Sequence, residues 1–183
     1  MKKIFSLMML CLCGLAFVSC ESSDDPFDGG NKFKACAFVA TPTFSQDLLN
    51  LFDFTMTYTA MDGSVKTVKP NAKGELYAED VYQNLPATVK FEVKAVKKAN
   101  FDEYLKSKDV FDFSVVVPGY VASYLSSSGE LVLLHADVNV FEMKGIKSEV
   151  AADYLSKRDN FFNYTFEGTY TKNSNGTCSF SVK

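Results

Sequence analysis

The chain has 183 residues, of which 47% are hydrophobic, 14% aromatic and 22% charged, and its formal net charge at pH 7 is −3. This composition is typical of a globular protein and excludes wholesale disorder. A mildly acidic chain is not attracted to nucleic acid, and the presence of one histidine disfavours a metal centre rich in imidazole ligands. We therefore expect no nucleic-acid partner and no cofactor.

The first predicted element is a signal peptide over residues 1–19. Lys2 and Lys3 give it a positive start, and an apolar run without charge follows over 4–18. This run has the length of a signal sequence and is short for a membrane span, which needs about 20 apolar residues. Removing 19 of the 183 residues, two lysines among them, leaves 164 residues and changes the net charge from −3 to −5.

The apolar run ends in Phe17-Val18-Ser19-Cys20, with a small residue directly before a cysteine. This arrangement resembles the lipobox of bacterial lipoproteins, although Phe17 stands where that family usually has leucine. In the family the cysteine is acylated, with chains such as palmitate, and becomes the N-terminus once the signal is cut. The resemblance implies that Cys20 is the lipid-attachment residue. The alternative is an ordinary secretory signal in which Cys20 has no role.

Residues 20–32 are predicted to form a lipidated acidic tether. Directly behind Cys20 the sequence reads Glu-Ser-Ser-Asp-Asp, and the segment as a whole is polar and contains two glycines. It resembles the surface-export signal of lipoproteins from the Bacteroidota, which implies an outer-membrane, lipid-anchored protein that faces the cell exterior. The alternative is a solvated linker without signal value. A dozen such residues typically span about 19 Å, so the folded part is expected close to the membrane.

Residues 33–183 are predicted to form a single all-β domain, because apolar and polar residues alternate with a period of two. The clearest alternation places Phe52, Phe54, Met56, Tyr58 and Ala60 on one face. Strands are expected near 34–41, 52–60, 64–69, 75–82, 88–95, 110–117, 130–142, 161–171 and 177–183. About nine short strands predict an antiparallel β-sandwich of immunoglobulin-like type, with a barrel as the alternative.

Helical periodicity is scarce. It predicts one short helix near 148–158 and a further helical turn at 100–107. The apolar residues that share a face of the first are Val150, Ala151, Tyr154 and Leu155. The helix near 148–158 is expected to cover an end or an edge of the sandwich.

Two turn signals punctuate the strands. Asn173–Gly176 is expected to join the last two strands, and Asp62-Gly63 predicts a tight hairpin because both residues tolerate positive φ. The register of this hairpin stays open. A two-residue loop would put Val65 on the inner face and leave Val68 outside.

Two cysteines remain beyond the predicted anchor. Cys36 and Cys178 lie in the first and last predicted strands, each in phase with apolar neighbours. Export would bring them to a compartment where a disulfide persists, and a bond between them would close a loop of over a hundred residues. The alternative is two buried free thiols that act as small apolar side chains.

His135 is the only histidine and lies in the predicted strand 130–142, with Asp137 and Asn139 on the same face. A His-x-Asp pair on a strand can supply two metal ligands, but nothing indicates a third, so no metal site is predicted. The simpler interpretation is a polar, solvent-facing side of the strand. The opposite, core-facing side would consist of Val132, Leu134, Ala136, Val138 and Val140.

The sequence contains no catalytic motif. It lacks a Gly-x-Ser-x-Gly elbow, a Walker loop and a Gly-x-Gly-x-x-Gly loop. The adjacent carboxylates Glu79-Asp80 and Asp102-Glu103 are explained by solvation at the surface. We therefore predict no catalytic residues and a protein that is not an enzyme.

The weak binding-loop candidates are Tyr120 and Tyr124, which fall between the predicted strands 110–117 and 130–142. Exposed tyrosines on a loop could stack on a sugar or form a contact with a protein. The alternative is that both rings cover one end of the core.

Together these features predict an outer-membrane surface lipoprotein with a non-catalytic binding or interaction role toward a glycan or a protein. Two alternatives stay open. A barrel-like carrier of a small apolar ligand would need a large internal cavity. A glycan-active hydrolase would need two carboxylates at glycosidase spacing in an open cleft.

Overall fold

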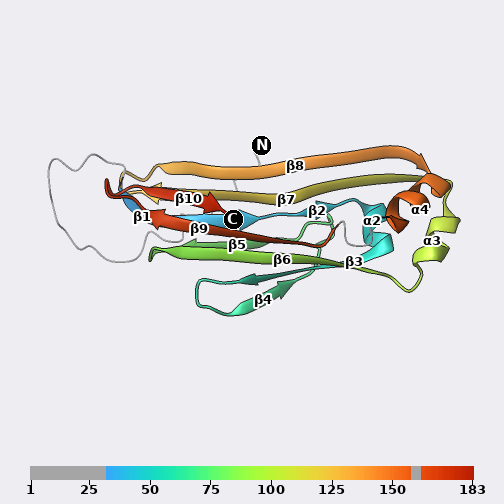
Figure 1. Ribbon diagram of the computed structural model, residues 1–183, viewed down its shortest axis with the longest axis horizontal. Helices are drawn as coiled ribbons and strands as arrows, with labels where there is room; N and C mark the ends of the chain where they lie inside the picture. Colours follow the sequence, from blue (N-terminus) through green and yellow to red (C-terminus); the bar gives the residue numbers. More distant parts are fainter. Residues whose placement is uncertain (1–31, 158–161) are drawn as a thin grey trace.

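A computed structural model describes residues 32–157 and 162–183. Two antiparallel sheets face each other along the long axis of the molecule (Figure 1), which confirms the predicted β-sandwich. The first sheet contains β5 (Ala78–Tyr82), β1 (Phe33–Ala40), β2 (Thr43–Phe44), β7 (Val110–Ser126) and β8 (Leu131–Lys147). The second contains β10 (Cys178–Val182), β9 (Tyr164–Lys172), β6 (Ala87–Lys97), β3 (Phe52–Thr59) and β4 (Val65–Val68).

These ten strands, counted within the described ranges, exceed the predicted number of about nine by the two-residue β2. β1 and β2 lie one after the other along one edge of β7, and β8 pairs with its opposite edge. The narrower immunoglobulin-like assignment stays a prediction.

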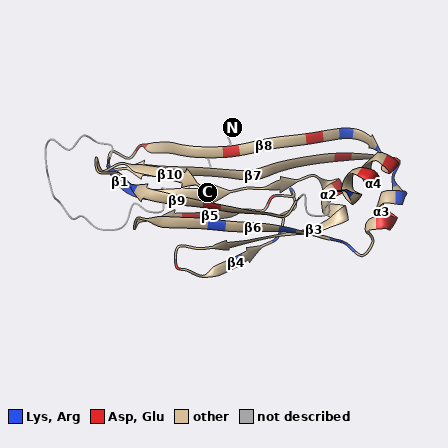
Figure 2. Cartoon of the chain, in the orientation of Figure 1, with Lys and Arg blue, Asp and Glu red and all other residues tan. Residues whose placement is uncertain are grey.

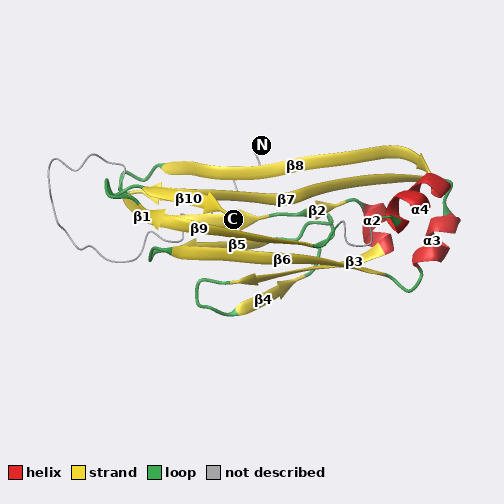
Figure 3. Cartoon of the chain, viewed as in Figure 1, coloured by secondary structure: helices red, strands yellow, loops and turns green. Residues whose placement is uncertain are grey.

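Three short helices gather at one end of the sandwich (Figure 3). They are α2 (Gln46–Leu51), α3 (Phe101–Ser107) and α4 (Ser148–Ser156). α4 confirms the predicted helix near 148–158, and α3 confirms the helical turn at 100–107. The predicted apolar face of α4 needs one correction, because Ala151 and Leu155 are buried whereas Val150 is exposed. α2 was not predicted; it buries Leu48 and Leu51, which lie one helical turn apart.

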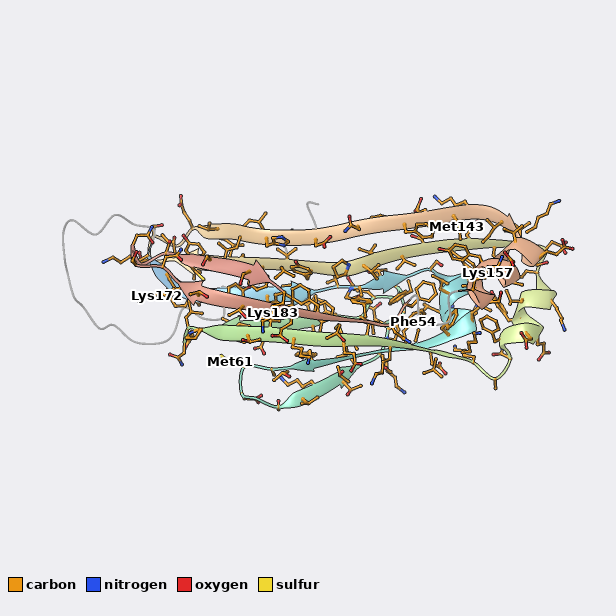
Figure 4. All side chains as sticks on the ribbon, in the orientation of Figure 1. Phe54, Met61, Met143, Lys157, Lys172 and Lys183 are labelled. Atoms are coloured by element: carbon orange, nitrogen blue, oxygen red, sulfur yellow. The ribbon has the colours of Figure 1, made fainter. Side chains whose placement is uncertain are left out.

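The core fills the space between the two sheets and is rich in aromatic rings. Phe44 of β2 stacks on Phe54 of β3, with ring centroids 3.8 Å apart, and so joins the two sheets. Phe54 lies near the helical end of the sandwich (Figure 4). Phe162 meets both rings edge-on. Farther along the sandwich, Tyr120 of β7 contacts Phe166 of β9 at 4.2 Å between centroids. Buried residues of all three helices belong to the same core, which therefore spans the whole sandwich.

β7 and β8 form a hairpin whose two strands have 17 residues each, longer than the predicted 110–117 and 130–142. Pro118-Gly119 does not end β7 as the sequence suggests. The register shifts between Pro118 and Tyr120, so a bulge takes up the additional residue, and Gly119 adopts a φ of +62°.

The β3–β4 hairpin has a longer loop than two residues. Thr59 pairs with Val65, and the Ala60 N–H donates to the Ser64 carbonyl at 2.9 Å. Val65 is 72% exposed, whereas Val68 packs against the core. The register that the sequence left open is thus the one in which Val68, not Val65, faces inward.

Candidate functional site

Strand β8 forms a long edge of the first sheet. Within the described residues its only strand partner is β7, so its outer side offers backbone groups to a further strand over much of its 17 residues. Four large apolar side chains on β8 are exposed, namely Leu133 (58%), Val138 (46%), Val140 (62%) and Phe141 (37%). Phe141 stacks on Tyr154 of α4, and we call β8 with the other three side chains the β8 edge. Natural edges are usually short or covered, so an edge of this length that exposes several large apolar side chains is a candidate interaction surface.

The exposed side chains of β8 correct one sequence prediction. Val132 and Leu134 pack against the core as predicted, but Ala136, Val138 and Val140 face solvent. Leu134 is the additional residue of a β-bulge, because the register between β7 and β8 shifts at this position. A bulge reverses the alternation of the residues that follow it, and the strand beyond Leu134 therefore presents its apolar side outward.

The same bulge turns the polar residues of β8 toward the seam between β8 and β10. The Tyr120 hydroxyl and His135 Nδ1 share a hydrogen bond of 2.9 Å, and the two rings stack with centroids 5.7 Å apart. Phe180 of β10 lies 6.4 Å from the His135 ring. Asp137 pairs with Tyr120 across the ladder, and the Asn139 amide donates to the Asp137 carboxylate. These residues form a polar cluster at the seam, in which His135 and Asn139 are exposed to solvent, as the sequence predicted, and Asp137 is half-buried.

The seam cluster has the chemistry of a hydrogen-bonding site. Burial and the negative charge of Asp137 raise the pKa of Tyr120 to about 12, so its hydroxyl keeps the proton at neutral pH. Within residues 32–157 and 162–183, no group of three or more His, Cys, Asp or Glu side chains is arranged to hold a metal ion.

Tyr120 and Tyr124 do not lie on a loop. Both belong to β7, and their side chains are 1% and 4% exposed. β7 continues past Pro118-Gly119 through its bulge, and this continuation places both rings on the inner face of the sheet. The prediction of a tyrosine binding loop is therefore wrong, and both rings are part of the core.

Cys36 of β1 and Cys178 of β10 face each other between the two sheets. Both are buried free thiols, and their Sγ atoms lie 3.2 Å apart. The hydrogen bond between them raises the pKa of Cys36, as does burial, and it lowers the pKa of Cys178. The structure thus brings together the two cysteines that the sequence singled out, and the disulfide itself stays a prediction.

A polar network at the helical end was missed by sequence reasoning. The buried Asp47 carboxylate accepts hydrogen bonds from Lys108 Nζ at 2.6 Å, from the Tyr104 hydroxyl at 2.8 Å and from the Asp112 N–H at 2.8 Å. Burial alone would raise the pKa of Asp47, but these donors hold it below its usual range. Acidic and basic residues are frequent on the surrounding helices (Figure 2). The donors lie 57 to 65 residues away in sequence, so no local spacing could have indicated them.

Two hollows bear on the ligand-carrier and hydrolase alternatives. One, in the core between β1, β5 and β6, is lined by rings such as Phe38 and Tyr82 and has a volume of about 10 Å³, hardly room for one water molecule. The other, an open polar hollow of about 380 Å³, lies at the turn Asn173–Gly176 beside Lys32 and Lys172. Among the described residues, no carboxylate lines this second hollow.

The predicted signal peptide, Cys20 and the tether up to residue 31 lie outside the described residues. No helix in the described part of the chain is long and apolar enough to span a bilayer. In comparisons with known proteins, the chain matches no protein-family model, no curated protein and no solved structure.

Proposed function

We propose that this protein is a lipid-anchored lipoprotein of the outer membrane that faces the cell exterior and binds a protein partner without catalysis. The anchor is Cys20, at the end of the apolar run 4–18, and the acidic residues behind it direct the chain to the surface. A β-sandwich with an uncovered edge is a suitable module for this role, because such edges bind extended segments of other proteins.

The observation that carries the binding role is the β8 edge. Its backbone offers a ladder to a partner strand, and Leu133, Val138 and Val140 offer apolar contacts to the partner's side chains. A protein in extended conformation fits this surface better than a glycan. The two tyrosines that the sequence offered for stacking on a sugar, Tyr120 and Tyr124, are buried.

The carrier alternative finds little support in the packing of the core, where the hollow near Phe38 has only about 10 Å³. A carrier of a drug-sized ligand needs a pocket of roughly 300 Å³ or more. No specific observation favours the hydrolase. We therefore propose a single function, attachment to the membrane and recognition of an extended protein segment.

The location is tested by protease treatment of intact cells, with lysed cells as the reference. We expect the wild-type protein to be digested on intact cells and a Cys20→Ala variant to be absent from the digested surface fraction. Protection of the wild-type protein until lysis would contradict surface display and would place the protein on the periplasmic side.

The binding surface is tested by a photo-crosslinking residue placed at Val140 in intact cells. The matched control is the same residue at Val65, which is 72% exposed on β4 at the far edge of the second sheet, against 62% for Val140. We expect an adduct of higher mass from position 140 only. Equal adducts at both positions, or none at 140, would remove the β8 edge as the binding surface.

A further inference from the structure

Strand β10 is short and lies at the edge of the second sheet. It has five residues, and within the described residues its strand partner is β9 alone. Its first residue, Cys178, points across the sandwich to Cys36 in the middle of β1. The last strand of one sheet thus meets the first strand of the other at a pair of sulfur atoms.

The cysteine pair is enclosed by aromatic side chains. Cys36 pairs with Tyr82 on one side of β1 and with Tyr124 on the other, so both tyrosines share its inner face. Cys36 is 0% exposed and Cys178 is 4% exposed. The Tyr170 hydroxyl donates to the Ala37 carbonyl at 2.7 Å, which fixes β9 against β1 beside the pair. The two sheets are therefore held in place where the sulfur atoms meet.

The distance between the two Sγ atoms is short enough for a disulfide to form. The Sγ atoms lie 3.2 Å apart, and a disulfide needs about 2.05 Å, so a movement of roughly 1 Å shared between two side chains would close the bond. We propose that Cys36 and Cys178 form a disulfide that joins the two sheets of the mature protein, with the disulfide of a thiol–disulfide oxidoreductase as the oxidant. This inference requires export of the chain but not display on the outer face, so it stands apart from the proposed binding role.

The reaction balances as two exchanges. The Cys178 thiolate attacks one sulfur of the oxidoreductase disulfide, forms a mixed disulfide and releases the second oxidoreductase sulfur as a thiolate. The Cys36 thiol then loses its proton and attacks Cys178 Sγ, which expels the first oxidoreductase sulfur. The chain loses two electrons and two protons, and the oxidoreductase disulfide becomes two thiols. Cys178 is suited to the first step because it is the more exposed cysteine and its strand lies at an edge.

Tryptic peptide mapping without reductant tests the proposal on the full chain. Protein taken from the envelope is denatured in an alkylating agent, so that free thiols are trapped, and is then digested. Cleavage after Lys34, Lys66 and Lys172 places each cysteine in its own peptide, 35–66 and 173–183. We expect the two peptides joined, lighter than their sum by two hydrogen atoms. A Cys178→Ala variant is the control and should give peptide 35–66 alkylated and alone.

Thermal unfolding gives the second readout. The bond would close a loop between residues 142 positions apart, so reduction should lower the Tm of the wild-type protein on the order of 10 °C. The same reductant should leave the Tm of Cys178→Ala unchanged. Recovery of both peptides separate and alkylated, from envelope protein and also after folded protein is incubated with oxidised glutathione, would overturn the proposal.

Discussion

At the scale of single residues, the Asp47 network explains how the helices are fixed to the sandwich. The Asp47 carboxylate of α2 accepts hydrogen bonds from a tyrosine of α3, from Lys108, the residue after α3, and from the backbone of β7. Every donor is matched to an oxygen, and within the described residues no buried side-chain nitrogen or oxygen lacks a hydrogen bond. Removing a buried carboxylate that accepts several hydrogen bonds destabilises a fold more than removing one partner of an exposed ion pair, because the buried donors lose their acceptor.

Asp47→Asn should therefore destabilise the protein by about 2 kcal/mol at pH 7, because it removes charge-assisted hydrogen bonds and leaves Lys108 without its carboxylate. The folded-state pKa of Asp47 is lowered, so its contribution is complete above the unfolded pKa of about 3.9 and is lost as the pH falls through the folded value. Urea unfolding at pH 7 and at pH 3 should show the difference between variant and wild type shrinking at the lower pH.

A matched control for this prediction is Asp153→Asn. Asp153 of α4 pairs with Lys157, the residue directly after the helix, and both side chains are more than 60% exposed. Its loss should hardly change the free energy of unfolding at either pH. Equal changes in the free energy of unfolding for the two variants would show that the network around Asp47 does not fix the helices to the sandwich.

At the scale of elements, β2 has only two residues but is stabilised by backbone hydrogen bonds on both of its sides. One side pairs with β7, and on the other the Phe44 N–H donates to the Gly74 carbonyl at 2.9 Å. Gly74 adopts a φ of +77°, and a Cβ there would lie 2.1 Å from the Phe44 carbonyl oxygen. The turn around Gly74 therefore needs glycine for space as well as for conformation.

Gly74→Ala should cost more stability than Gly129→Ala in the β7–β8 turn. Gly129 has a φ of +86°, but a Cβ added there would meet no atom within 4 Å, so alanine adds only the strain of the left-handed backbone, about 1–2 kcal/mol. At Gly74 the clash with backbone should add about 1–3 kcal/mol. Chemical denaturation of both variants measures the loss in free energy of unfolding. Equal losses would show that the backbone around Gly74 moves enough to relieve the clash.

Element prediction from sequence succeeded where alternation is uninterrupted. β3 keeps its period of two from Phe52 to Tyr58 and was predicted almost to the residue. β8 was placed correctly but its faces were not, because the bulge at Leu134 reverses the pattern and no residue type marks it. α2 has six residues, which is too short for a helical period to be seen. The alternation of apolar residues indicated that Cys36 and Cys178 both face the core. Their contact, however, depends on the strand order, which places β10 opposite β1.

At the scale of the whole molecule, the two sheets and the three helices of the described residues share one core. Phe44 and Phe54 join the sheets near the helices, and Tyr120 and Phe166 join them farther along. Among the described residues, a second apolar cluster is small: it surrounds Ala37 and Val39 on the outer side of the first sheet.

Unfolding should therefore be a single cooperative transition. The loss of strand signal in far-ultraviolet circular dichroism and the loss of aromatic signal in the near ultraviolet should have the same urea midpoint. Because the chain contains no tryptophan, the near-ultraviolet signal comes from its 9 tyrosines and 17 phenylalanines. Separate midpoints would indicate that one sheet unfolds before the other.

The direction of the long strands sets how an anchored molecule would stand on a cell. Phe33 enters β1 beside the β7–β8 turn, where it pairs with Ser126, and the helices lie at the opposite end (Figure 1). A strand of 17 residues measures about 55 Å. With Cys20 in the membrane, the turn would lie near the lipid and the helical cap would form the tip. The β8 edge would then run perpendicular to the membrane surface. It would be accessible to partners that approach parallel to the membrane.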